Sequence, residues 1–426
     1  MIWIKFRSSF HLKIGSDMFS LTQFIAEEKN THMTHIEELI FLGGVDGTRQ
    51  AINFLRDLRD MLKGNSTKKI DVTVKWDGAP AIFAGVDPAD KKFFVAKKGL
   101  FAKTPKMYKT QDDIKKELSG ELAKKFSIAL TEFSKLGIRN GVYQGDLMFT
   151  KGEVKVETID GQQYYTFQPN TIVYAVPVKS KLGQKIAKAK IGIVWHTTYT
   201  GSTIKNMKAS FGKNIVDKFR KAPGTWMDDA TYRDITGKAL FTPEESTAFD
   251  GLLSQAGRLF RKVDGDALRA IQNDEEMRKK VMTFINTYVR SGSNFPASGE
   301  MATALVQYLN EWYQKEIDKK KSEKGKESWK AKRDEMVDKV IMNKGQLIAM
   351  FDLMKVLVEA KGMVMAQFDK TQKVDTLLRT TKGFQVTRQE GFVAIDKLKG
   401  GAVKLVDRLE FSKANFSPEI IKGWQK

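Results

Sequence analysis

The 426-residue chain contains no cysteine and only four histidines. The absence of cysteine excludes disulfide bonds, a thiolate nucleophile and a cysteine-type zinc site. No apolar run reaches the ~18 residues that a membrane-spanning helix needs, and residues 1–19 are too short and interrupted for a secretory signal. We therefore expect an intracellular protein with no membrane association, in the cytoplasm (or the host cytoplasm for a viral protein). The oligomeric state stays open.

Acidic residues are scarce in two stretches of the chain. Overall, 72 Lys and Arg face 51 Asp and Glu, for a net charge of +21. Residues 91–109 hold seven lysines and no acid, and residues 161–216 hold eight lysines and no acid. A solvated surface usually mixes charges of both signs. The uneven charge favours a polyanionic partner whose phosphates release counterions on binding, and nucleic acid is preferred over a membrane surface.

Hydrophobic periodicity divides the chain into alternating helical and strand-rich parts. Apolar residues three and four apart predict helices over about 18–62 and over much of 202–362. Alternating runs with turn residues between them predict strands over 70–201, with one helix at about 112–136, and short strands again after 384. We expect an α+β fold interrupted by a large helical insertion, with divisions at 1–62, 63–201, 202–380 and 381–426.

One lysine stands among strand residues in TVKWDGAPAIFAG, residues 73–85. Alternation places Lys75 and Asp77 on the face opposite Val74, and Gly78 leaves room for a ligand near the backbone. A desolvated lysine beside other cations loses its proton and becomes a nucleophile. From these four positions alone, a solvent-exposed lysine on the polar face of a strand is the favoured interpretation.

The context of Lys75 resembles that of the covalent nucleotidyltransferases, which include ATP-dependent DNA and RNA ligases and mRNA capping enzymes. The K-x-D-G of residues 75–78 is similar to their nucleophile motif, whose lysine forms a lysyl–nucleotide phosphoramidate. Segments similar to the later motifs follow in the family's order: FFVAKKG (93–99), GVYQGDLMF (141–149), IGIVWHTTYTG (191–201), QEGFVAI (389–395) and GAVKLVDR (401–408). The resemblance implies a nucleotidyltransferase (adenylation) core of antiparallel sheets, covering under half of the chain.

The same resemblance implies a role for each motif residue. Lys75 would be the nucleophile, kept uncharged by neighbouring cations, and the implied activity is ATP-dependent joining of RNA or DNA ends or nicks through lysyl-AMP. The other implied roles are nucleotide binding for Asp77, Gly78, Lys98, Trp195 (or Tyr199) and Lys404; binding of Mg²⁺ or Mn²⁺ for Asp146 and Glu390; and nucleic-acid binding for Lys97, Lys103 and Lys106.

The chain also departs from the family's pattern. Pro80 replaces the ribose-contacting arginine of many DNA ligases, Asp146 replaces a glutamate, and Thr73-Val74 replace the acid that reads adenine. The segment that follows Arg408 is too short for the C-terminal OB domain of typical DNA ligases and capping enzymes. These departures favour an enzyme like the phage-type RNA ligases.

Other interpretations stay open beside an RNA ligase. A DNA ligase, a GTP-using capping enzyme and a nucleic-acid-binding protein with an inactive core are the nearest. The H-x-T elements at 32–34 and 196–198 also match the two-histidine phosphoesterases that act on RNA ends, and His32 with His35 would offer a metal site.

Overall fold

The computed structural model describes residues 34–64, 70–211, 214–230, 239–370, 374–381, 383–388, 390–396, 402–408, 415 and 417–423. The strands within them are β1 (Ile70–Lys75), β2 (Ala81–Val86), β3 (Phe93–Ala96), β4 (Val142–Thr150), β5 (Lys155–Ile159), β6 (Gln162–Phe167), β7 (Ile172–Pro177), β8 (Ile191–Thr200), β9 (Lys208–Phe211), β10 (Thr225–Asp229), β11 (Asp375–Thr380), β12 (Gly383–Val386), β13 (Gly391–Asp396) and β14 (Ala402–Leu405).

The helices of the described residues are α2 (Leu39–Leu62), α3 (Gln111–Glu117), α4 (Gly120–Phe133), α5 (Lys181–Lys188), α6 (Pro243–Lys262), α7 (Gly265–Asn273), α8 (Glu275–Ser291), α9 (Ser298–Asp318), α10 (Glu323–Met342) and α11 (Lys344–Asp369). Short 3₁₀ turns are η1 (Ile36–Glu38), η2 (Lys98–Phe101), η3 (Ser134–Leu136), η4 (Lys151–Glu153), η5 (Ile204–Asn206) and η6 (Val216–Lys218).

The strands form three sheets. Sheet A has the order β1-β13-β14, sheet B the order β10-β8-β4-β2-β3 with β9 also pairing β8, and sheet C the order β12-β11-β7-β6-β5. All strand pairs are antiparallel except β10 with β8. The strands that follow the helical region return to the earlier ones, because β13 pairs with β1 and β11 pairs with β7. The predicted α+β class, with antiparallel sheets and a large helical region, is confirmed.

The strand predictions between 70 and 201 are confirmed as β1 to β8, but two helical predictions need correction. The single helix expected over 112–136 is two helices, because the chain turns at Leu118–Ser119 and Gly120 adopts a positive φ of 57°. The helical run expected from 202 begins at Pro243 instead, because β9 and β10 first complete sheet B. The part of the N-terminal helix predicted before residue 34 lies outside the described residues.

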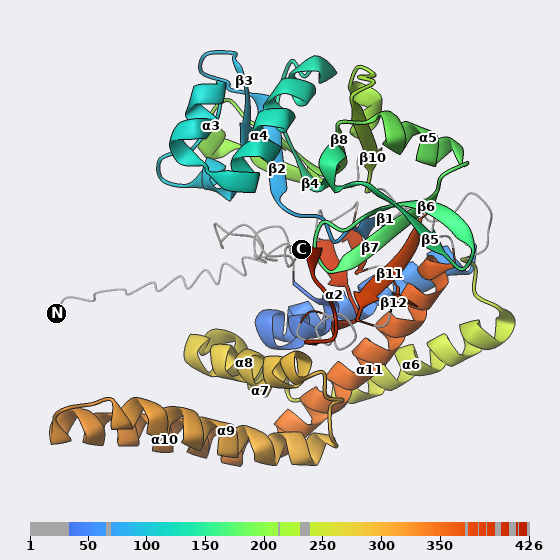
Figure 1. The fold of residues 1–426 in the computed structure, drawn as a ribbon. Helices are drawn as coiled ribbons and strands as arrows, with labels where there is room; N and C mark the ends of the chain where they lie inside the picture. Colours follow the sequence, from blue (N-terminus) through green and yellow to red (C-terminus); the bar gives the residue numbers. More distant parts are fainter. Residues whose placement is uncertain are drawn as a thin grey trace, which may run out of the picture.

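The helices α6 to α11 join α2 in one body beneath sheets A and C, with α9 and α10 farthest from sheet B (Figure 1). The long helix α11 is buried along much of its length, packing against α6, α9 and α2. The inner face of sheet A closes this core through Val72, Phe392 and Leu405. None of the helices in the described part of the chain is both long and apolar enough to cross a bilayer.

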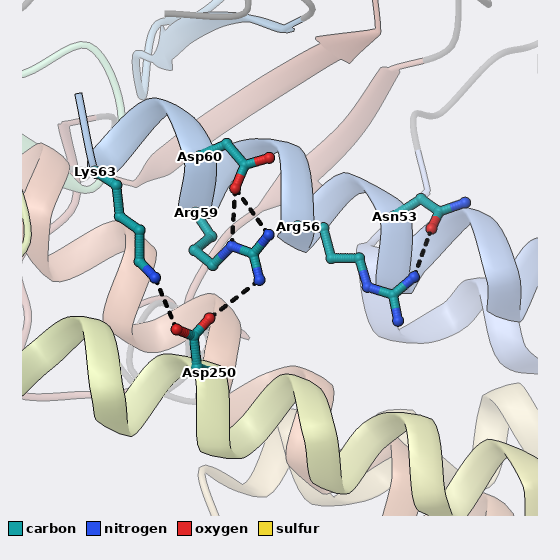
Figure 2. Close-up of polar contacts among 6 residues, drawn as sticks. All are labelled: Asn53, Arg56, Arg59, Asp60, Lys63 and Asp250. Carbon is teal, nitrogen blue, oxygen red and sulfur yellow. Dashed lines mark hydrogen bonds and ion pairs between the residues drawn. The ribbon is translucent and has the colours of Figure 1, made fainter. Parts of the chain in front are cut away.

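Polar contacts tie α2 to α6, although the whole of sheet B lies between these two helices in the sequence (Figure 2). Asp250 of α6 accepts from Arg59 at 3.1 Å and from Lys63 at 2.7 Å. Arg59 also pairs with its neighbour Asp60 at 2.8 Å. The N-terminal helix therefore belongs structurally to the helical body rather than forming a separate unit.

Candidate active site

Lys75 ends β1 where sheet A meets sheets B and C. Its backbone pairs with Gly391 of β13, and its ammonium forms an ion pair with the carboxylate of Glu390. Thr73 pairs with Val393, which in turn pairs with Lys404 of β14. Residues directly opposite one another share a face of a sheet, so Lys75 and Lys404 lie on the same face. Segments that precede and follow the whole helical region thus meet at one place.

The electrostatics of Lys75 differ from the expectation that nearby cations keep it uncharged. Burial lowers its pKa, but the carboxylates of Glu390, Asp146 and Asp77 outweigh burial, and the pKa is raised. Lys404 shows the opposite shift. Its pKa is lowered by burial and by the charge of Lys75. As the protein stands, Lys75 is a paired ammonium.

Glu390 is a buried carboxyl group among other acids. Burial raises its pKa to about 7, with Asp77 and Asp146 adding to the shift and Lys75 opposing it. No set of three or more His, Asp or Glu in the described part of the chain is arranged to hold a metal. Asp146 and Glu390 are nonetheless two acids that both act on Lys75. A pair of carboxylates suits Mg²⁺ because this ion uses one or two protein carboxylates together with phosphate oxygens.

Asp77 and Gly78 serve the fold at this corner. The carboxylate of Asp77 accepts from Asn170 Nδ2 at 2.6 Å, Thr171 N at 2.7 Å and Ile172 N at 2.9 Å, and its own N–H donates to Tyr174 at 2.7 Å. A Cβ on Gly78 would come within 2.6 Å of the Asp146 side chain. Asp77 thereby locks the end of β1 to the start of β7, and the space beside Gly78 is filled by β4 rather than left open for a ligand.

Asp146 of β4 has a histidine beside it. Nε2 of His196 lies 3.7 Å from its Oδ2, and Nδ1 of His196 is 2.7 Å from Thr197 Oγ1. Both Asp146 and His196 are partly exposed on the same side of sheet B. Sequence reasoning placed His196 only in an H-x-T element. The second such element needs His32, which lies outside the described residues, as does the proposed metal pairing of His32 with His35.

Trp195 does not face the site, which corrects its assignment to base stacking. It is fully buried on the opposite face of sheet B, 5.4 Å from the Phe133 ring and 5.6 Å from the Phe219 ring. The face of Asp146 instead carries Tyr199, whose hydroxyl donates to Gln144 at 2.7 Å. Tyr199 is the alternative aromatic residue of the same strand, and burial raises its pKa to about 12.

A group of ionisable residues that sequence reasoning missed lies near Lys404, where β14 contacts η1 and α11. The Lys404 N–H donates to Thr34 O at 2.9 Å, and His35 forms a parallel bridge with Lys404. Arg408 pairs with Glu38 at 2.8 Å.

His35 has a buried Nδ1 without a hydrogen-bond partner in the described structure. Its pKa is lowered well below 6.5 by burial and by the charges of Arg408, Lys361, Lys404 and Lys75. Nothing in the spacing of residues 34–38 predicts that His35 is buried beside these cations.

The four lysines assigned to phosphate contacts differ in whether they already have an acidic partner. Lys98 and Lys103 are exposed and Lys97 is half-buried, around the turn η2. Lys106 is engaged with Glu117 at 2.6 Å, which raises its pKa. Of the four, Lys106 is the one that already has an acidic partner among the described residues.

A family model described as "Family of unknown function (DUF6267)" covers residues 30–420. No curated protein and no solved structure matches the chain.

Proposed function

The chain belongs to this family of unknown function, DUF6267, and we propose from the site alone that it is an ATP-dependent polynucleotide ligase acting through lysyl-AMP at Lys75. One observation carries the proposal. The lysine of the K-x-D-G segment forms an ion pair with Glu390 and shares a face of sheet A with Lys404. Both residues follow the helical body in the chain and come from the two segments that resemble the closing motifs. A lysine on the polar face of an ordinary strand has no reason to lie within this set.

The first step forms a bond between Lys75 Nζ and the α-phosphorus of ATP. The ammonium releases its proton to water, the amine attacks, and the bond from the α-phosphorus to the pyrophosphate oxygen breaks. Lys404 would balance the negative charge that develops on the phosphate oxygens. Mg²⁺ held by Asp146 and Glu390 would draw the charge of these carboxylates away from Lys75 and so lower the pKa of its ammonium.

The later steps need no further protein nucleophile. The 5′-phosphate of a polynucleotide displaces Lys75 from AMP, and the 3′-hydroxyl of a second end then displaces AMP with loss of a proton. The net charge of +21 and the acid-free lysine stretches support a nucleic acid as the substrate. RNA ends are favoured by the Pro80 departure from the DNA ligase pattern.

The test is incubation with α-labelled ATP or GTP and Mg²⁺, without nucleic acid. We expect an acid-labile label on the protein from ATP that is lost in Lys75→Ala and retained in Lys155→Ala, a matched change at an exposed lysine of β5. A label from GTP alone would indicate a capping enzyme, and sealing restricted to nicked DNA a DNA ligase. A folded protein that takes no label from either nucleotide contradicts the proposal and leaves an inactive core.

A further inference from the structure

A large aromatic side chain is exposed beside the candidate site. Phe101 at the end of η2 is 37% exposed, one of few large apolar residues so exposed among those described. Its ring lies 4.9 Å from Tyr199 and 5.5 Å from Phe83, measured between ring centroids. The two inner rings support Phe101 from below and leave its outer side in solvent. An aromatic ring held in this way offers a fixed flat surface for another ring.

The fold brings the two acid-free stretches together around Phe101. The turns η2 and η5 are in contact, and Leu100 and Ile204 share one buried cluster with Met207 at its edge. Lysines of both stretches therefore lie on one rim of sheet B. We call these residues the lysine rim: Lys97, Lys98, Lys103, Lys205 and Lys208.

The lysine rim differs from the neighbouring lysines in its ion pairs. Within the same first stretch, Lys106 pairs with Glu117 and Lys109 pairs with Asp87 and Asp90. The structure gives the lysine rim no ion pair with any described residue, and four of its five lysines are exposed. Its positive charge is thus available to an external anion.

The position of Phe101 links the rim to the nucleophile. Ala81 and Phe83 of β2 pair with Asp146 and Gln144 of β4, so all four share one face of sheet B. Two residues along a strand span about 7 Å. Phe83, which supports Phe101, therefore lies about one nucleotide's length along the strand from the position of Asp146, on the same surface.

We propose that Phe101 and the lysine rim bind the single-stranded end of a polynucleotide, with one base stacked on Phe101 and the following phosphates along the lysines. Exposed aromatic rings flanked by unpaired cations are the elements by which proteins hold single strands without reading sequence. A mononucleotide is too short to reach all five lysines, which lie on two segments of the chain. An anionic membrane surface would offer Phe101 no aromatic ring to stack against. The inference rests on the proposed function for its role at the site, but the binding itself is independent of catalysis.

The test measures fluorescence anisotropy of a labelled single-stranded oligonucleotide of roughly 16 residues with the full-length protein. We expect Phe101→Ala to weaken binding by about 5- to 100-fold. The change Lys103→Gln/Lys205→Gln/Lys208→Gln should weaken binding and flatten its dependence on salt. The matched control is Lys179→Gln/Lys181→Gln/Lys185→Gln, three lysines of the same acid-free stretch at α5, which should bind like the wild type. Phe101→Leu checks for folding and should melt like the wild type while still binding weakly.

The outcomes separate this inference from the proposed function. Oligonucleotide binding that needs Phe101 in a protein that forms no lysyl-AMP supports the rim and contradicts the ligase proposal. Normal lysyl-AMP formation, with oligonucleotide binding unchanged in Phe101→Ala and in the triple lysine variant, overturns the binding inference alone. The binding inference is also overturned when Phe101→Ala raises the KM for ATP without weakening oligonucleotide binding. The same holds when the protein binds anionic phosphatidylserine vesicles and does not bind the oligonucleotide.

Discussion

Replacement of Asp77 distinguishes an anchoring residue from a nucleotide ligand. The buried carboxylate accepts three hydrogen bonds from residues 170–172, at 2.6 to 2.9 Å. In Asp77→Ala these donors lose their partner, at about 1–3 kcal/mol each when they stay buried, so the loss is at least about 3 kcal/mol. Asp77→Asn keeps one acceptor oxygen but turns an amide N–H₂ toward the same donors, and we expect a loss of about 2–4 kcal/mol.

The assay is thermal melting of Asp77→Asn followed by circular dichroism, together with labelling by α-labelled ATP below the melting range. For a chain of this length, a loss of this size corresponds to a decrease in Tm of roughly 2–4 °C. Asp112→Asn, an exposed acid of α3, serves as the matched control and should melt like the wild type. We expect the folded Asp77→Asn protein to keep a measurable fraction of its labelling.

The opposite pattern refutes this reasoning. A variant that melts like the wild type but takes no label would make Asp77 a ligand of the nucleotide, as the resemblance implies. A variant that neither melts earlier nor loses label would show that the link between β1 and β7 does not depend on this carboxylate.

Two further predictions concern the helical body and its junction with sheet A. Lys361→Met removes the nearer of two cations from the buried Glu37, the one at 2.9 Å, and leaves Arg408 at 3.8 Å. Urea unfolding should therefore give a loss at the lower end for a broken buried pair, about 3 kcal/mol. Asp250→Ala, whose pairs are part-exposed, should lose less than about 1 kcal/mol, and the reverse ranking contradicts the structure. The pKa of His35 is lowered in the folded protein, so below pH 6.5 the unfolded chain takes up a proton at this side chain and the folded protein does not. The contribution of neutral His35 to stability is therefore present above pH 6.5 and is lost as the pH falls below that value. His35→Gln should reduce the dependence of stability on pH between 7.5 and 5.5, by up to about 1.4 kcal/mol per pH unit, and equal slopes would exclude His35 as the source.

The strands could be predicted because their signals are local. Alternation and turn residues mark each of the eight segments between 70 and 201, and each forms a strand. Alternation also placed Lys75 on the face opposite Val74, as found, whereas Asp77 lies beyond the end of β1 and is held by residues 170–172. The break between α3 and α4 had a local signal as well, because Ser119-Gly120 is typical of a helix start, but the hydrophobic periodicity on either side obscured it.

The face of β8 could not be predicted, for a physical reason. Ile191 to Trp195 are all buried, so apolar alternation does not distinguish the two sides of the strand. The pairing with β4 also shifts between Gln144 and Gly145, which places His196 as an extra residue. After this shift, Tyr199 lies on the face of Asp146 and Trp195 on the other. The parity of a strand cannot be counted through a bulge that depends on its neighbour.

The surroundings of Lys75 depend on contacts that no local pattern encodes. Within the described sheets β1 is an edge strand whose sole partner is β13, and β13 follows the whole helical body in the chain. On the same side, Lys361 of α11 pairs with Glu37, and Glu38 with Arg408 just after β14. The helical body therefore does more than extend the molecule. It fixes the strands that place Glu390 and Lys404 on the face of Lys75, so the charge around Lys75 depends on how the helices pack.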